Sequence, residues 1–184
     1  TKIDIIYTRQ GVQKKGQIVL DEVEIKAVPY YRLLPNQTGY IVLSKFNEKA
    51  SAETKEALLK LKEQGATKII LDLRDNPGGL LHEAVNICNL FVPKDEIIVT
   101  TKSKNSVHNH TYKTRNEPID TEIPLAVIVN DRSASASEIV SGALQDLDRA
   151  VIVGNRSFGK GLVQRPFNLA YGTQVKVTIS KYYT

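Results

Sequence analysis

Apolar residues in this chain form compact runs that alternate with stretches of helical spacing. Three nearly continuous apolar runs lie at 67–73, 124–129 and 150–154, and a fourth strand-like run lies at 40–46. Continuous runs of this kind are typical of strands covered on both faces of a sheet. Apolar residues at helical spacing predict helices over 51–65, 80–90 and 135–147. The chain is therefore expected to have an α/β fold, with a central sheet and helices on its faces.

The first helix is predicted to run from Ser51, as N-cap, to Gly65, as C-cap. It connects the runs 40–46 and 67–73, which makes a βαβ unit. A parallel strand pair with a right-handed crossover is expected there.

The remaining strands are expected nearer the two ends of the sequence. The polar and apolar pattern predicts them at 1–11, 16–20, 23–28, 96–101, 111–114 and 173–183. The last of these alternates regularly, so it should be half exposed. The whole chain, 1–184, is interpreted as one domain.

Composition narrows the functional classes. The chain has 184 residues, 41% hydrophobic and 24% charged, and a net charge of +5. The basic residues are dispersed and no apolar run approaches the ~20 residues of a membrane span, so neither nucleic-acid binding nor a transmembrane segment is predicted. Cys88 is the only cysteine and is expected to be a buried structural thiol. Because methionine and a signal-peptide pattern are both absent at the start, the sequence is interpreted as a fragment or a processed product.

Two polar loops follow predicted strands and are the candidates for chemistry. Arg74–Gly79 (RDNPGG) follows one strand, and could be a wall of a site or only a turn that needs its glycines. A serine-rich loop follows another strand and leads into a helix, where backbone N–H groups favour developing negative charge. Ser133, Ser135 and Ser137 are each a candidate nucleophile, and each could instead be an N-cap.

Lys160, in the segment SFGKGLVQ, is the candidate base for such a serine. A lysine amine can act as a general base where its surroundings favour the neutral form. Gly154–Lys160 also fits the G-x-x-x-x-G-K pattern of a phosphate-binding loop, but Gly161 follows in place of Ser or Thr, so nucleotide binding is rejected. His108 and His110 lack a third ligand, so an exposed loop is favoured over a metal site.

The segments SASASEIVSGALQD and RAVIVGNRSFGKGLVQ resemble the core of the carboxy-terminal processing (tail-specific) proteases. The turn LDLRDNPGGLLHEAV and the strand YIVLSKF are similar to further parts of that family, in the same order. The resemblance covers roughly residues 39–184. It implies a ClpP/crotonase-like α/β core, with a central, mostly parallel sheet, flanking helices and peripheral strands. It also implies a peptide-binding PDZ domain upstream, and residues 1–38 are then interpreted as the exit of that domain plus peripheral strands.

The resemblance also assigns roles within this sequence. Ser135 would be the nucleophile and Lys160, 25 positions later, the general base. Gln164 would orient the amine, and Asp146 would have a supporting role. The oxyanion hole would be formed by the backbone N–H of Ala136 and one from the Asn76–Gly79 turn, namely Gly78 or Gly79. No metal or cofactor is implied.

The implied function is serine endopeptidase cleavage of protein or peptide substrates near exposed C-termini, through a Ser–Lys dyad and an acyl-enzyme. The implied setting is extracytoplasmic, in a bacterial periplasm or envelope. Three alternatives stay open: a non-catalytic peptide- or ligand-binding module on the same core, a fragment that is inactive without its PDZ domain, and a crotonase-like acyl-CoA enzyme.

Overall fold

A central five-stranded sheet carries most of the fold in the computed structural model, which describes residues 1–21, 23 and 25–184. Its strand order is β3-β4-β5-β8-β9. The pairing of β3 with β4 is antiparallel, whereas β4 with β5, β5 with β8 and β8 with β9 are parallel. The bounds are β3 Tyr30–Leu34, β4 Thr38–Val42, β5 Lys68–Asp72, β8 Leu125–Val129 and β9 Val151–Gly154.

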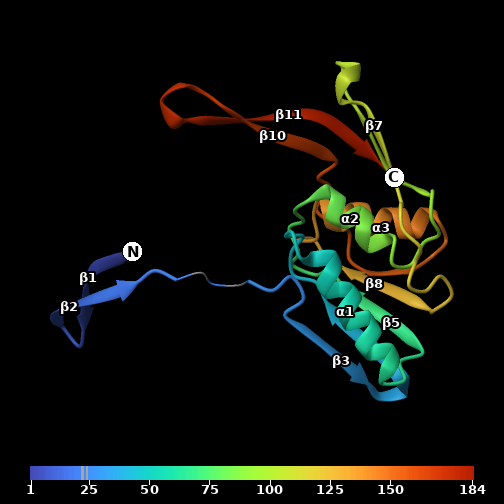
Figure 1. Ribbon diagram of the computed structural model, residues 1–184, viewed down its shortest axis with the longest axis horizontal. Helices are drawn as coiled ribbons and strands as arrows, with labels where there is room; N and C mark the ends of the chain where they lie inside the picture. Colours follow the sequence, from blue (N-terminus) through green and yellow to red (C-terminus); the bar gives the residue numbers. More distant parts are fainter. Residues whose placement is uncertain (22, 24) are drawn as a thin grey trace.

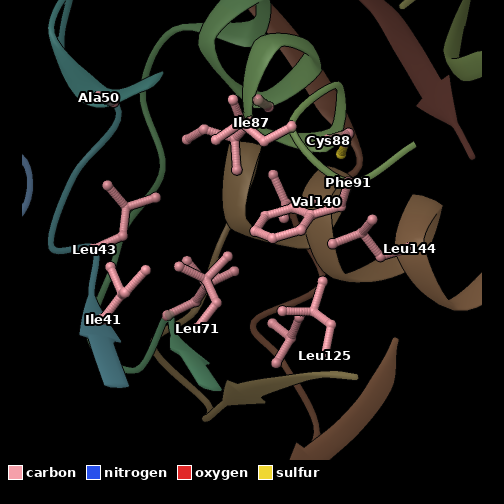
Figure 2. Packing of buried hydrophobic residues seen from close by; sticks show 14 of the residues in the cluster. Ile41, Leu43, Ala50, Leu71, Ile87, Cys88, Phe91, Leu125, Val140 and Leu144 are labelled. Atoms are coloured by element: carbon pink, nitrogen blue, oxygen red, sulfur yellow. The ribbon is translucent and has the colours of Figure 1, made fainter. Parts of the chain in front are cut away.

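Three helices pack on one face of this sheet (Figure 1). They are α1 Ala50–Glu63, α2 Leu81–Cys88 and α3 Ala136–Asp146. Side chains of the strands meet side chains of α2 and α3 in one core (Figure 2), in which Phe91 is fully buried. This core therefore holds in place the end of the sheet at which the polar loops begin.

A second sheet of four strands lies on the other side of α2 and α3 (Figure 1), in the order β10-β11-β6-β7. All three of its pairings are antiparallel. Its strands are β6 Ile97–Lys102, β7 His110–Lys113, β10 Leu162–Asn168 and β11 Gln174–Tyr183. Short 3₁₀ turns occur at Pro35–Gln37, Ser106–His108 and Ala170–Gly172.

The first strands form a separate antiparallel hairpin of β1 (Lys2–Arg9) and β2 (Val12–Val19). Figure 1 shows it apart from the two larger sheets. Among the described residues, none of the helices combines the length and apolar character needed to cross a bilayer.

Most predicted elements are present, and the differences have physical causes. The first helix runs from Ala50 to Glu63, so its N-cap, Lys49, lies two positions before the predicted Ser51, and its C-cap, Gln64, lies one position before the predicted Gly65. The strand predicted over 23–28 is wrong for the described part of that range, which is not in a strand, while residues 22 and 24 lie outside the described residues. The prediction that the run 150–154 is covered on both faces is also wrong. The run contains β9, which is an edge strand. Its Val151 and Val153 are 67% and 49% exposed, because the helices cover only one face of the sheet.

Candidate active site

The serine-rich loop is fastened to the Arg74–Gly79 turn by buried hydrogen bonds. Ser133 Oγ donates to the carbonyl of Leu73 at 2.8 Å, and Ser137 Oγ donates to the carbonyl of Asn76 at 2.9 Å. Both serines are completely buried. Their hydroxyls are therefore structural, and they connect loops about sixty residues apart.

Ser135 differs from its two neighbours in backbone conformation and in surroundings. Its φ of 58° and ψ of −112° place a non-glycine residue in the left-handed half of φ/ψ space. Such strain costs on the order of 1–3 kcal/mol and is concentrated at functional sites. Ser135 is half-buried and lines a cavity. Of the three candidate serines, it is the one placed for reaction.

That cavity, of about 430 Å³, also contains Lys160. The glycine turn forms one wall, and Leu81, Ile139 and Leu162 are among the apolar side chains around it. The structure thus places Ser135, Lys160 and the glycines around one cavity, and their catalytic roles stay predictions. No hydrogen bond joins Ser135 Oγ to Lys160 Nζ among the described residues, and catalytic hydrogen bonds are often long without substrate.

Glu138 connects the backbones of Ser135 and Lys160. Its carboxylate accepts the N–H of Ser135 at 2.8 Å, of Lys160 at 2.9 Å and of Gly159 at 2.6 Å. It also accepts the Ser157 hydroxyl at 2.8 Å. One side chain at the start of α3 therefore sets where the Lys160 loop sits relative to Ser135.

Tyr182 of β11 makes a second connection, through carbonyl groups. Its hydroxyl points at the carbonyl oxygens of both Lys160 and Ser135, the latter at 3.2 Å. Its own N–H donates to the carbonyl of Gly161 at 3.1 Å. Burial, followed by the negative charge of Glu138, raises the pKa of Tyr182, so the phenol stays protonated and able to donate.

The two candidate oxyanion-hole glycines differ in availability. The Gly78 N–H donates to Asn76 Oδ1 at 2.9 Å, so it is already used. The N–H groups of Gly79 and Ala136 have no acceptor among the described residues, and both residues line the cavity. Gly78 matters for space instead, because a Cβ there would lie 2.6 Å from the Ala134 carbonyl oxygen and 2.8 Å from the Ala136 nitrogen.

Charged side chains brace the turn below the site. Arg74 Nη2 lies 2.6 Å from Asp72 Oδ2, and the Tyr40 hydroxyl bonds the same oxygen. Burial opposes ionisation of Asp72, but the hydrogen bonds from Arg74 and Tyr40 outweigh it and lower its pKa. Asn130 donates to Asp75 Oδ1 at 2.8 Å, which adds a polar link between the turn and the serine loop.

Gln164 and Asp146 differ in their position relative to the cavity. Gln164 lines it, and its side-chain amide donates to Thr178 Oγ1 at 3.4 Å, so its role in orienting the lysine stays a prediction. The structure does not bring Asp146 to the cavity, since it is exposed at the far end of α3. Its supporting role stays a prediction. No hydrogen bond or ion pair joins Asp146 to Ser135 or Lys160 among the described residues.

Sequence reasoning missed Glu138 and Tyr182 as parts of this site. A Ser followed three residues later by Glu is the capping-box signature, and that signal could have identified Glu138. No local signal points to Tyr182. Cys88 is fully buried, and this burial raises the pKa of its thiol to about 12, as fits a structural residue.

Comparison with known proteins identifies the family of this chain. The model of peptidase family S41 matches residues 37–184, which include every residue of the candidate site. The chain belongs to peptidase family S41. Residues 1–36, which contain the separate hairpin, lie outside that match.

Similar proteins carry related names. A carboxyl-terminal-processing protease of Synechocystis sp. is 41% identical over 189 aligned residues, which take in 100% of this chain and 44% of that protein. A Staphylococcus aureus protein named "Probable CtpA-like serine protease" is 35% identical, over 100% of this chain and 37% of that protein. This chain therefore spans less than half the length of these relatives.

A solved structure gives the same result for the fold. The photosystem II D1 C-terminal processing protease is similar with a TM-score of 0.76 and 31% sequence identity, over 100% of this chain and 51% of that one. The α/β architecture described above is thus that of an S41 protease structure.

Proposed function

We propose that the protein containing this chain is a serine endopeptidase that cleaves protein substrates near their C-termini through Ser135 and Lys160. The observation that carries the proposal is the meeting of a strained, cavity-lining Ser135 with Lys160 and two unpaired backbone N–H groups in a family of proteases. The proposal includes the ClpP/crotonase-like description of the core and an extracytoplasmic setting, as the family resemblance implies.

In the proposed first step, the neutral amine of Lys160 accepts the proton of Ser135 as Oγ attacks the scissile carbonyl carbon. The oxyanion that forms is held by the N–H groups of Ala136 and Gly79, and Gly79 is preferred because the Gly78 N–H is already bound to Asn76. Each such donor contributes about 10²–10³ in rate where it has been removed from other proteases.

The tetrahedral intermediate then collapses as the Lys160 ammonium gives its proton to the leaving amine. An ester between Ser135 and the acyl part of the substrate is left. Water then attacks this ester as the Lys160 amine takes its proton. Lys160 returns that proton to Ser135 Oγ as the ester C–O bond breaks and the new C-terminus is released. Among the described residues, the hydrogen bonds of the Glu138 and Tyr182 side chains to Ser135 and Lys160 reach only backbone atoms, so we assign them a positioning role without proton exchange with the substrate.

The test uses the full-length protein and a fluorophosphonate probe, which phosphonylates activated serines with loss of fluoride. We expect Ser135 to be labelled, and expect Ser135→Ala and Lys160→Ala each to abolish labelling and proteolysis while the far-UV circular dichroism stays unchanged. Ser133→Ala is the matched control on the same loop. It should lower the free energy of unfolding while Ser135 is still labelled, because the Ser133 hydroxyl is structural. Proteolysis that survives in Ser135→Ala would exclude this serine as the nucleophile.

A further inference from the structure

Strand β10 has one unpaired edge, and this edge begins at the candidate active site. Among the described residues, β10 pairs with β11 alone and is the outermost strand of its sheet. Its first three residues, Leu162, Val163 and Gln164, line the cavity that contains Ser135 and Lys160. A sheet edge with free N–H and C=O groups is a template for another extended chain.

The hydrogen bonds at its two ends show which β10 residues face outward. The Tyr182 N–H donates to the Gly161 carbonyl, and the Leu169 N–H donates to the Thr173 carbonyl, so Gly161 and Leu169 direct their backbone polar groups towards β11. Backbone direction alternates along an antiparallel strand. Even-numbered positions between them, beginning with Leu162 and Gln164, therefore direct their backbone groups to the free edge.

The irregularity in the β10–β11 ladder does not disturb this alternation. Val163 pairs with Ser180 and Gln164 with Thr178, so the extra residue is Ile179 on β11. Consecutive residues of β10 stay consecutive in the ladder. The outward-facing positions counted from Gly161 are therefore the same as those counted back from Leu169.

Pro166 is the next outward position, and it has no N–H to donate. Proline within a sheet is confined to positions where its nitrogen faces away from the ladder, which is the direction derived above. The series of edge donors therefore stops at Pro166. From Leu162 to Pro166 an extended strand covers roughly 13 Å, the length of about four residues.

We propose that the β10 edge from Leu162 to Gln164 binds the backbone of an extended substrate segment as an added strand, and that Pro166 ends the pairing. The inference rests on the proposed function, because it assigns the substrate of the same cavity. Main-chain hydrogen bonds at Leu162 and Gln164 would hold an unfolded segment of almost any sequence. Folded substrates would be refused, since their backbone groups are already paired.

The first experiment alters the substrate and leaves the enzyme intact. A synthetic peptide is made around the first site at which the full-length protein cleaves β-casein, an unfolded protein, with one backbone N-methyl group at each position in turn. An added strand donates from alternate residues. We therefore expect KM to rise about tenfold at every second position on one side of the scissile bond, and less than about threefold at the positions between.

The second experiment alters the edge. Leu162→Pro removes the outward N–H, whereas Leu162→Ala shortens the side chain and keeps that N–H. We expect KM for the peptide to rise more in Leu162→Pro than in Leu162→Ala. The matched control is Asn168→Pro, which removes an outward N–H beyond Pro166, and its KM should equal that of the unaltered protein.

The outcomes separate this inference from the proposed function. If fluorophosphonate labels Ser135 and the peptide is cut, but N-methylation is tolerated at every position, the edge does not bind the substrate backbone. Equal effects of Leu162→Pro and Asn168→Pro would overturn it too. If neither labelling nor cleavage occurs, the proposed function fails, and this inference fails with it.

Discussion

The serine half of the candidate site, residues 130–138, and its lysine half, residues 154–161, are built in different ways. In the serine half, Ser133, Ala134, Ala136 and Ser137 are all buried, and two hydroxyls fasten the loop to the neighbouring turn. In the lysine half no residue is buried. Ser135, the proposed nucleophile, is thus held by the core, whereas Lys160, the proposed base, is held by the few groups that reach its loop.

Those few groups are mainly Glu138 and Tyr182, together with the Phe158 N–H, which donates to the Ser133 carbonyl at 3.0 Å. Under the proposed function, this difference predicts that activity depends most on the placement of Lys160. Changes in the serine half should cost both fold and activity. Changes in the lysine half should cost activity with little loss of stability.

The largest effect is expected from Gly78→Ala, in the turn that supports the serine half. The new Cβ would meet the backbone of Ala134 and Ala136, and the residue has a φ of +94°. We expect proteolysis to be lost and the free energy of unfolding, measured with urea, to fall by about 3 kcal/mol or more.

Gly65→Ala is the matched control, because Gly65 has a φ of +93° and open space around it. It should cost only the backbone strain, about 1–2 kcal/mol, and leave proteolysis unchanged. Equal costs for the two variants would show that the serine half is not closely packed against the turn.

Glu138→Gln should produce the next largest effect. An amide keeps one acceptor oxygen but turns an NH₂ group towards backbone donors that the carboxylate now accepts. We expect kcat to fall about 100-fold with KM little changed, and stability to fall by about 1–3 kcal/mol. Glu53→Gln is the control, because Glu53 also lies in the first turn of a helix and accepts a backbone N–H, that of Val28. A fall in kcat of similar size there would show a general loss of fold.

Tyr182→Phe removes one hydroxyl and keeps the ring. We expect kcat to fall about tenfold, which corresponds to roughly 1.4 kcal/mol. The free energy of unfolding in urea at neutral pH should change by no more than about 1 kcal/mol. The phenol has a raised pKa in the folded protein, so its contribution to stability is complete below about pH 10 and declines as pH rises further. The stability difference between the two proteins should therefore be constant to about pH 9 and shrink above pH 10.

Ser157→Ala should have the smallest effect. It removes one of the donors to Glu138 from an exposed loop and leaves the other bonds in place. A two- to fivefold lower kcat with the same urea midpoint is expected, on the order of 0.5–1 kcal/mol for one hydrogen bond. If the free energy of unfolding fell by more than the activation free energy rose, as calculated from kcat, the description of the lysine half would be contradicted.

The sequence predicted the parts of the fold and site that local patterns determine. The β4-α1-β5 unit followed from apolar runs and helical spacing, and its parallel pair is present. The choice of Ser135 came from family spacing, because the residue types alone left three serines. The structure adds the reason for that choice in the bonds of Ser133 and Ser137.

The rest depends on contacts that a linear pattern does not contain. An apolar run such as 150–154 indicates a strand, but not whether a second layer covers its other face, and β9 is largely exposed. Tyr182 meets Lys160 and Ser135 only because β11 returns beside Gly161. The availability of Gly79 over Gly78 likewise depends on one side-chain bond from Asn76.

The order of these parts along the chain also has a consequence for biosynthesis. The buried contacts of the Ser135 loop with the glycine turn are translated before Lys160, whereas Tyr182, which contacts the carbonyls of both Ser135 and Lys160, follows later. We therefore expect a ribosome-bound chain that ends before residue 160 to fold its nucleophile loop yet to react with no fluorophosphonate. Under the proposed function, we expect proteolysis to begin only after Lys160 and Tyr182 have been translated.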